Sequence, residues 1–217
     1  MKKYDTIIFD LDGTLLNTLD DLADSVNYAL GMYGFPCREI AEVRSFVGNG
    51  VARLMELSIP DGLKNLQYEK CLADFCSYYS ENMQNKTGAY EEIMELLKEL
   101  SKVGYKIAIV SNKFDKAVKE LNQVYFGEYI KVAIGESENI RRKPAPDTVF
   151  KALEELGSTA DKAVYVGDSE VDVQTAKNSG IMCVGVTWGF RGREVLEREG
   201  ADYIIDRPGE LLKIIDC

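Results

Sequence analysis

The chain has 217 residues, of which 46% are hydrophobic and 29% are charged, a composition typical of a globular protein and not of a collagen, a coiled-coil rod or a disordered chain. Its formal net charge of −10 disfavours nucleic-acid binding, because an acidic surface repels phosphate polyanions. The chain has no histidine, which excludes histidine-based catalytic triads, histidine phosphatases and histidine-ligated zinc.

Short apolar runs rich in β-branched residues predict six strands. The runs are 6–9, 106–110, 132–134, 163–166, 183–186 and 203–205. Helical patterns separate most of them, at 91–103, 115–125 and 147–156 among others. Near-continuous apolar strands that alternate with helices are typical of a parallel sheet covered on both faces.

The hydrophobic pattern of residues 17–87 differs from that of the rest of the chain, because it contains no convincing strand. Apolar residues recur there at helical spacing, and Thr18 with Asp21 is predicted to form a capping box. The predicted fold class is therefore α/β: a Rossmann-like parallel-sheet core of residues 1–16 and 88–217, with an all-helical domain of residues 17–87 inserted into it.

The cysteines argue for a reducing environment. They are Cys37, Cys71, Cys76, Cys183 and Cys217, and no two of them form a CxxC pair. This spacing disfavours a disulfide framework and a structural zinc site.

The first apolar run, residues 6–9, is followed by Asp10 and Asp12, which makes it too short for a signal peptide or a membrane span. We therefore expect a cytoplasmic protein that does not enter a membrane.

Polar residues follow three of the predicted strands, and in a parallel sheet the carboxyl ends of the strands form the ligand-binding edge. The segments are Asp10-Leu11-Asp12-Gly13-Thr14, Ser111-Asn112-Lys113 and Gly167-Asp168-Ser169 with Asp172 shortly after, and Lys143-Pro144 precedes a predicted helix. Four carboxylates can share one crevice only if a cation neutralises them or some are protonated. Oxygen ligands without histidine or cysteine select a hard metal, so Mg²⁺ is the predicted cofactor.

These residue types are suited to phosphoryl chemistry. A carboxylate beside Mg²⁺ can attack phosphorus. Asp12 would face away from Asp10 in an extended strand, but a turn that begins at Asp10 and is loosened by Gly13 would return Asp12 to the site for general acid–base work. Ser111 and Lys143 would hold the non-bridging oxygens and balance their charge.

In this order, the four motifs resemble those of the haloacid dehalogenase superfamily over nearly the whole chain. The resemblance implies that Asp10 attacks phosphorus to form an aspartyl-phosphate, and that Asp12 protonates the leaving group and then activates water. An aspartate at position 12 argues for a phosphatase or phosphomutase, because dehalogenases lack it. The implied ligands are Asp10, the Asp12 carbonyl, Asp168 and Asp172 (directly or through water) for Mg²⁺, and Ser111, Asn112 and Lys143 for phosphate.

Within the superfamily, the insert resembles the small helical cap, and three segments resemble phosphoglycolate phosphatases. They are Val47-Gly48-Asn49-Gly50, Ser111-Asn112-Lys113 and Thr187-Trp188-Gly189-Phe190. In the first, Gly48, Asn49 and Gly50 would let backbone N–H groups approach a small anionic substrate. The segment Thr87–Glu92 departs from that pattern, because it lacks both prolines of the usual Pro-Tyr-Pro-Gly linker.

We therefore expect a Mg²⁺-dependent phosphatase that acts on a small phosphorylated metabolite, with 2-phosphoglycolate as the first choice, in a monomer or homodimer. Three alternative functions remain: a β-phosphoglucomutase-type phosphomutase, a pyrophosphatase and a nucleotidase with a similar cap. A receiver-type signalling domain fits less well. It carries its acidic pair on the first strand and its phospho-acceptor on a later one, and it is shorter and needs no insert.

Overall fold

The computed structural model describes residues 3–138 and 140–215 and divides into two compact units. Unit 1 comprises Met1–Leu16 and Ala89–Cys217, and unit 2 comprises Asn17–Gly88. Cys217 lies outside the described residues, and Cys37, Cys71, Cys76 and Cys183 are free thiols. Within the described part of the chain, none of the helices is both long enough and apolar enough to span a membrane.

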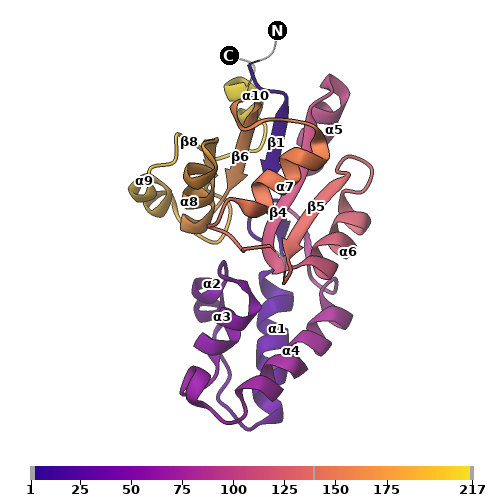
Figure 1. Cartoon of the computed structure of the whole chain (residues 1–217). Coiled ribbons are helices and arrows are strands. Elements are labelled where there is room, and N and C mark those ends of the chain that lie inside the picture. The colour runs from indigo at the N-terminus through magenta and orange to yellow at the C-terminus, as the bar shows by residue number, and fades with distance from the viewer. Residues whose placement is uncertain (1–2, 139, 216–217) are drawn as a thin grey trace. The chain divides into compact units, whose positions relative to one another are not determined.

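Unit 1 is built on a six-stranded sheet with the order β5-β4-β1-β6-β7-β8 (Figure 1). The strands are β1 (Thr6–Phe9), β4 (Lys106–Phe114), β5 (Val132–Glu136), β6 (Ala163–Gly167), β7 (Met182–Val186) and β8 (Tyr203–Ile205). Every neighbouring pair in this sheet is parallel. The predicted α/β fold with a parallel sheet is confirmed.

Helices of unit 1 pack on the sheet. They are α5 (Ile93–Val103), α6 (Asp115–Tyr125), α7 (Asp147–Leu156), α8 (Glu170–Ser179), α9 (Arg193–Glu199) and α10 (Glu210–Ile215), with a short 3₁₀ turn η2 (Ala160–Lys162). One hydrophobic cluster joins Ile8 and Tyr165 of the sheet to α7, α8 and α9, and Figure 1 shows α7 in front of β4 and β5. The neighbours Ile7 and Val164 are also fully buried, and successive strand side chains point to opposite faces, so both faces of the sheet are covered.

Backbone conformation sets the ends of two of these helices. Helix α7 has the bounds that the pattern predicts, and Gly157 ends it with a left-handed φ of 58°. Helix α5 begins at Ile93 rather than at residue 91, because Glu92 has a φ of 64° and therefore cannot belong to a right-handed helix.

Strand β4 is longer than the apolar run predicts. The expected strand stops at Val110, whereas β4 continues through Ser111, Asn112 and Lys113 to Phe114, with a shift of register against β5. Gly135 on β5 makes this close pairing possible, because a Cβ there would lie 2.6 Å from the Lys113 carbonyl oxygen and 2.5 Å from Asp115 Cα. The polar segment is therefore part of the rigid sheet rather than a loop after it.

Unit 2 is helical. It contains α1 (Leu19–Met32), α2 (Ile40–Phe46), α3 (Gly50–Ser58), the 3₁₀ turn η1 (Gly62–Lys64) and α4 (Tyr68–Asn82). Helices α1 and α4 pack together, and the rings of Tyr28 and Tyr78 stack with centroids 3.8 Å apart. The chain enters and leaves this unit through two short strands, β2 (Leu16–Asn17) and β3 (Gly88–Ala89), which pair with each other.

The predicted capping box of Thr18 and Asp21 is wrong. Thr18 is the N-cap residue of α1, but no side-chain capping bond forms there. The Asp21 carboxylate instead accepts the backbone N–H groups of Lys86 and Thr87 at 2.9–3.0 Å. A local spacing rule could not anticipate this, because those partners lie 65 and 66 residues away in the chain.

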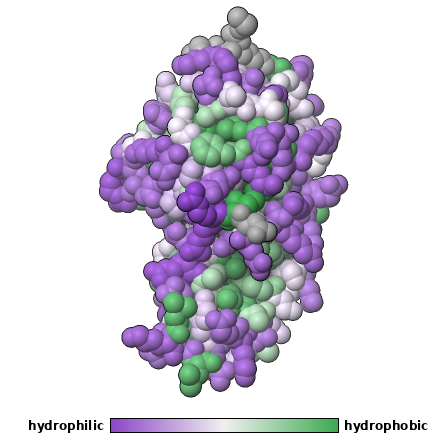
Figure 2. Space-filling model, in the orientation of Figure 1, coloured by the Kyte–Doolittle hydropathy of each residue, from purple (hydrophilic) through white to green (hydrophobic). Residues whose placement is uncertain are grey.

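Most of the face of the molecule shown in Figure 2 is hydrophilic. Large apolar side chains that are exposed include Leu63 and Leu66 in unit 2 and Phe150 on α7 of unit 1.

Candidate active site

Three predicted site carboxylates meet at the carboxyl ends of β1 and β6. Asp10 follows β1, Asp168 follows β6, and Asp172 lies in the first turn of α8. All three are buried, and one carboxylate oxygen from each lies within 4.8 Å of the other two. We call these residues the aspartate cluster.

The ammonium group of Lys143 lies against this cluster. Its Nζ is 2.7 Å from Asp10 Oδ1 and 2.7 Å from Asp172 Oδ1, and only 3% of its side chain is exposed. It also donates to the Tyr165 hydroxyl at 3.0 Å, and that hydroxyl donates to Asp172 Oδ1 at 3.0 Å. Asn112 donates its side-chain N–H to the Lys143 carbonyl at 3.0 Å. Residues predicted from separate motifs therefore form one connected network.

Asp168 is held by backbone that approaches it closely. Its Oδ1 accepts the Thr14 hydroxyl at 3.1 Å, and its Oδ2 accepts the Phe190 N–H at 2.7 Å. A Cβ on Gly13 would lie 2.5 Å from Asp168 Oδ2, and a Cβ on Gly189 would lie 2.4 Å from Asp168 Cβ. Only glycine fits at these two positions without moving the carboxylate.

Asp172 has two roles in this network. Its Oδ2 accepts the N–H and the hydroxyl of Ser169, at 3.0 and 2.6 Å, which forms the capping box that begins α8. Its Oδ1 accepts from Lys143 and Tyr165. The helix cap thus fixes the orientation in which Asp172 meets Lys143.

Asp12 lies outside the aspartate cluster and pairs with a different lysine, Lys113. Both of its carboxylate oxygens accept from Lys113 Nζ, at 2.8 and 3.0 Å. Only 2% of the Lys113 side chain and 12% of the Asp12 side chain are exposed. The turn that carries Asp12 contains Gly13 with a φ of 90°, as the sequence predicts.

Burial and mutual repulsion govern the charge state of the cluster. Burial raises the pKa of Asp10 well above its ordinary value, Lys143 opposes this rise, and Asp172 and Asp168 add to it. Burial, followed by the charge of Asp172, raises the pKa of Asp168 to about 7, although the bonds from Phe190 and Thr14 oppose the shift. The pKa of Lys143 lies well above its ordinary value, because Asp10 and Asp172 outweigh the opposing effect of burial.

The residues fit a divalent cation of the hard class. Asp10, Asp12, Asp168 and Asp172, set against the ammonium groups of Lys113 and Lys143, leave two formal negative charges when all are ionised. Burial, followed by repulsion from neighbouring carboxylates, raises the pKa values of Asp10 and Asp168, and a bound cation would oppose both effects. The donors are all oxygen atoms, which suits Mg²⁺.

The remaining predicted site residues lie in two places. Ser111 is buried in β4, and its Oγ accepts the N–H of Lys113 at 3.2 Å. In unit 2, Asn49 is the N-cap residue of α3, and Gly48 and Gly50 have φ values of 122° and 79°. Both glycines thus adopt backbone conformations that other residues rarely reach. Contact of this loop with a substrate stays a prediction.

Sequence reasoning left the role of Lys113 open and missed that of Tyr165, and both residues are buried. Lys113 belongs to the predicted Ser111-Asn112-Lys113 segment but had no predicted partner, and Tyr165 looks like an ordinary core residue of an apolar strand. Their partners, Asp12 and Lys143, are 101 and 22 residues distant in the chain, so no local spacing marks them. For Lys113 the available signal was its position directly after Ser111 and Asn112. Trp188, from the Thr187-Trp188-Gly189-Phe190 segment, donates its Nε1–H to the Thr14 carbonyl at 3.0 Å.

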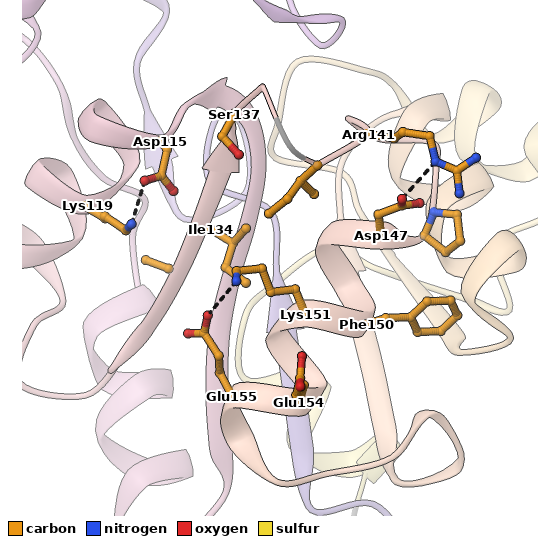
Figure 3. Close-up of a pocket in the computed structure, with 13 residues that line it drawn as sticks. Asp115, Lys119, Ile134, Ser137, Arg141, Asp147, Phe150, Lys151, Glu154 and Glu155 are labelled. Carbon is orange, nitrogen blue, oxygen red and sulfur yellow. Dashed lines mark hydrogen bonds and ion pairs between the residues drawn. The ribbon is translucent and has the colours of Figure 1, made fainter.

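A separate hollow of about 780 Å³ lies beside β5, α6 and α7 (Figure 3). Most of its charged side chains pair with one another, as Lys119 does with Asp115 at 2.6 Å and Arg141 with Asp147 at 2.9 Å. Its described lining contains none of the predicted site residues. We therefore assign the chemistry to the aspartate cluster.

Comparison with known proteins agrees with this geometry. Residues 7–186 match the family model described as haloacid dehalogenase-like hydrolase. A curated phosphoglycolate phosphatase from Aquifex aeolicus is 31% identical, over 97% of this chain and 96% of its own length. Another, from Pseudomonas syringae pv. tomato, is 33% identical over 92% of this chain and 76% of its own length.

Among solved structures, a candidate phosphoglycolate phosphatase from Lactobacillus delbrueckii subsp. bulgaricus is 36% identical, with a TM-score of 0.93 and 99% of each chain covered. The match to the family model extends over most of the chain and includes β1, β4, Lys143 and β6, which together carry the site. The chain belongs to the haloacid dehalogenase-like hydrolase family.

Proposed function

We propose that the protein is a Mg²⁺-dependent phosphatase that hydrolyses a small phosphomonoester through an aspartyl-phosphate on Asp10. Phosphoric monoester hydrolysis is supported by the family and by relatives named phosphoglycolate phosphatases. The observation that carries the proposal is the position of Lys143 Nζ, 2.7 Å from Asp10, within a buried cluster of carboxylates. This arrangement supports Asp10 as the nucleophile and Lys143 as the cation that binds the phosphoryl oxygens.

Asp10 attacks phosphorus in the first step. A bond forms between an Asp10 carboxylate oxygen and phosphorus, while the bond from phosphorus to the bridging oxygen breaks. Lys143 and Ser111 bind the non-bridging oxygens and stabilise the charge that they carry in the transition state. Asp10, Asp168 and Asp172 would hold Mg²⁺, which when bound lowers the repulsion between these carboxylates and the phosphoryl group.

Asp12 handles the proton in both steps. It donates a proton to the bridging oxygen as the leaving group departs, and it then takes a proton from the water that attacks the aspartyl-phosphate. The second attack releases inorganic phosphate and restores the Asp10 carboxylate. These two roles need the Asp12 carboxyl group to be near Asp10 but not to bind the metal, and this carboxyl group pairs with Lys113 instead of joining the aspartate cluster.

The names of the relatives support 2-phosphoglycolate as the substrate. The net charge of −10 favours a small substrate with a single phosphate over a polyanion. A cap role for unit 2, with Gly48, Asn49 and Gly50 contacting the substrate, belongs to the same proposal.

The test measures phosphate release from 2-phosphoglycolate beside sugar phosphates, nucleotides and pyrophosphate, with Mg²⁺ and with EDTA. A preference for 2-phosphoglycolate that EDTA removes supports the full proposal. Preference for another substrate keeps the chemistry and overturns the substrate. Conversion of β-glucose 1-phosphate to glucose 6-phosphate without phosphate release would instead identify a mutase.

A further inference from the structure

Lys113 forms an ion pair with Asp12, but the proposed reaction steps give Lys113 no role. Lys113 Nζ reaches both oxygens of the Asp12 carboxylate, at 2.8 and 3.0 Å. Because the ammonium contacts both oxygens, rotation of the Asp12 side chain about its Cα–Cβ bond would break two charge-assisted contacts at once, which holds the carboxyl group in place.

The pair differs from the nearby pair on the surface. Lys119 and Asp115 also form an ion pair, at 2.6 Å, but 62% of the Lys119 side chain and 30% of the Asp115 side chain are exposed. Exposed pairs of this kind contribute little and change their geometry easily. In contrast, only 2% of the Lys113 side chain is exposed, so water does not compete for its ammonium group.

The backbone holds Lys113 in place. It lies inside β4, and its N–H donates to Ser111 Oγ at 3.2 Å. Its carbonyl oxygen lies where a Cβ on Gly135 would be 2.6 Å away, so the neighbouring strand packs tightly against it. The lysine therefore extends toward Asp12 from a rigid base.

We infer that Lys113 is a positioning residue that aims the Asp12 carboxyl group at the bridging oxygen of the substrate. This inference rests on the proposed function. In the first step the Asp12 O–H proton moves to the bridging oxygen, which keeps the electron pair of the broken P–O bond, while Asp10 forms the new bond to phosphorus. In the second step, Asp12 receives a proton from water as the water oxygen bonds to phosphorus and Asp10 leaves.

The test compares substrates whose leaving groups need this proton to different degrees. An alkyl phosphate such as 2-phosphoglycolate expels a basic alkoxide, whereas p-nitrophenyl phosphate expels a weakly basic phenolate. We expect Lys113→Met to lower the rate of phosphoenzyme formation from alkyl phosphates by about 10²-fold, the lower range for loss of general acid catalysis, and from p-nitrophenyl phosphate by much less. Lys113→Arg, which keeps two N–H donors for Asp12, should restore part of the loss on alkyl phosphates.

Two controls separate positioning from a general structural effect. Lys119→Met removes the surface pair on the following helix and should change neither rate. In a protein that already carries Asp12→Asn, Lys113→Met should cause no further loss that depends on the leaving group. Thermal unfolding of each variant gives its folded fraction, by which the rates are normalised.

The outcomes are distinct. A loss confined to basic leaving groups, and absent in the Asp12→Asn background, supports the inference. An equal loss on all substrates, or no loss, overturns it while wild-type phosphatase activity stands. A wild-type protein that cleaves none of these phosphates overturns the proposed function and this inference with it.

Discussion

Asp10 in unit 1 and Asp21 in unit 2 are both buried carboxylates, but they have different kinds of partner. Asp21 accepts three bonds from the backbone N–H groups of Lys86 and Thr87, which tie the end of the insert to α1. Asp10 lies instead among Asp168, Asp172 and Lys143. Backbone N–H groups stabilise the charged form of a carboxylate, whereas a buried cluster of carboxylates is stable only with cations present or with some of its members protonated. The first arrangement stabilises the fold, and the second is the one to which we assign the proposed chemistry.

The largest effect expected from this contrast is on turnover. Asp10→Asn removes the proposed nucleophile and should lower kcat by on the order of 10⁴-fold or more. The free energy of unfolding should not fall, because burial and Asp172 disfavour the Asp10 charge and Lys143 keeps its ion pair with Asp172. Phosphate release and urea unfolding measure the two effects. Normal turnover would remove Asp10 as the nucleophile, and a large loss of stability would contradict the contrast with Asp21.

The next effect is on stability. Lys143→Met leaves Asp10 and Asp172 buried without their cation, and such a change costs about 3–5 kcal/mol. The matched control is Lys119→Met, whose exposed pair contributes about 0–1 kcal/mol. Urea unfolding of both variants tests the difference. Equal stabilities would mean that Lys143 is not needed to balance the cluster.

The contrast between local and distant partners also explains which features could be predicted from the sequence. Strands were predictable because parallel strands buried on both faces are continuous apolar runs, as in Thr6–Phe9 and Ala163–Gly167. The aspartate cluster was predictable because its members follow strand ends that the topology brings together. Asp21 was misread because its spacing from Thr18 fits a local motif while its partners are distant. The partner of Lys113 was not predicted for the same reason.

Strand β4 shows a second limit of prediction from the sequence, which concerns where a strand ends. Composition ends the strand at Val110, because Ser111, Asn112 and Lys113 are polar and strands at this depth are usually apolar. Their pairing depends on the space that Gly135 provides on a different strand. Propensity describes one segment at a time, so it cannot include the shape of a neighbour.

The pH dependence of the free energy of unfolding tests the aspartate cluster through Asp168. In the Mg²⁺-free protein the pKa of Asp168 is raised from 3.8 to about 7, so the folded state favours its protonated form. Its contribution to stability is therefore complete below pH 3.8 and is lost as the pH rises through about 7. The free energy of unfolding, measured by urea titration in EDTA, should fall across this window, and Asp168→Asn should flatten the fall.

Mg²⁺ provides the complementary measurement. Because the ion binds the ionised cluster of the folded state, it should raise stability above pH 7, by about 2.7 kcal/mol at a concentration 100 times its Kd. An equal effect of Mg²⁺ on the Asp168→Asn variant would show that the ion acts elsewhere.

The smallest effect is the one expected at Asp21. Asp21→Ala leaves the N–H groups of Lys86 and Thr87 without this acceptor, and a buried donor left unpaired costs about 1–3 kcal/mol. Asp24→Ala is the matched control, because Asp24 pairs with the Lys86 ammonium through side chains that are about half exposed, so its loss should cost about 0–1 kcal/mol. The kcat of the folded Asp21→Ala protein should stay near that of the wild type. If kcat falls as steeply as in Asp10→Asn, then Asp21 is also part of the chemistry, and backbone N–H partners do not mark a structural carboxylate in this fold.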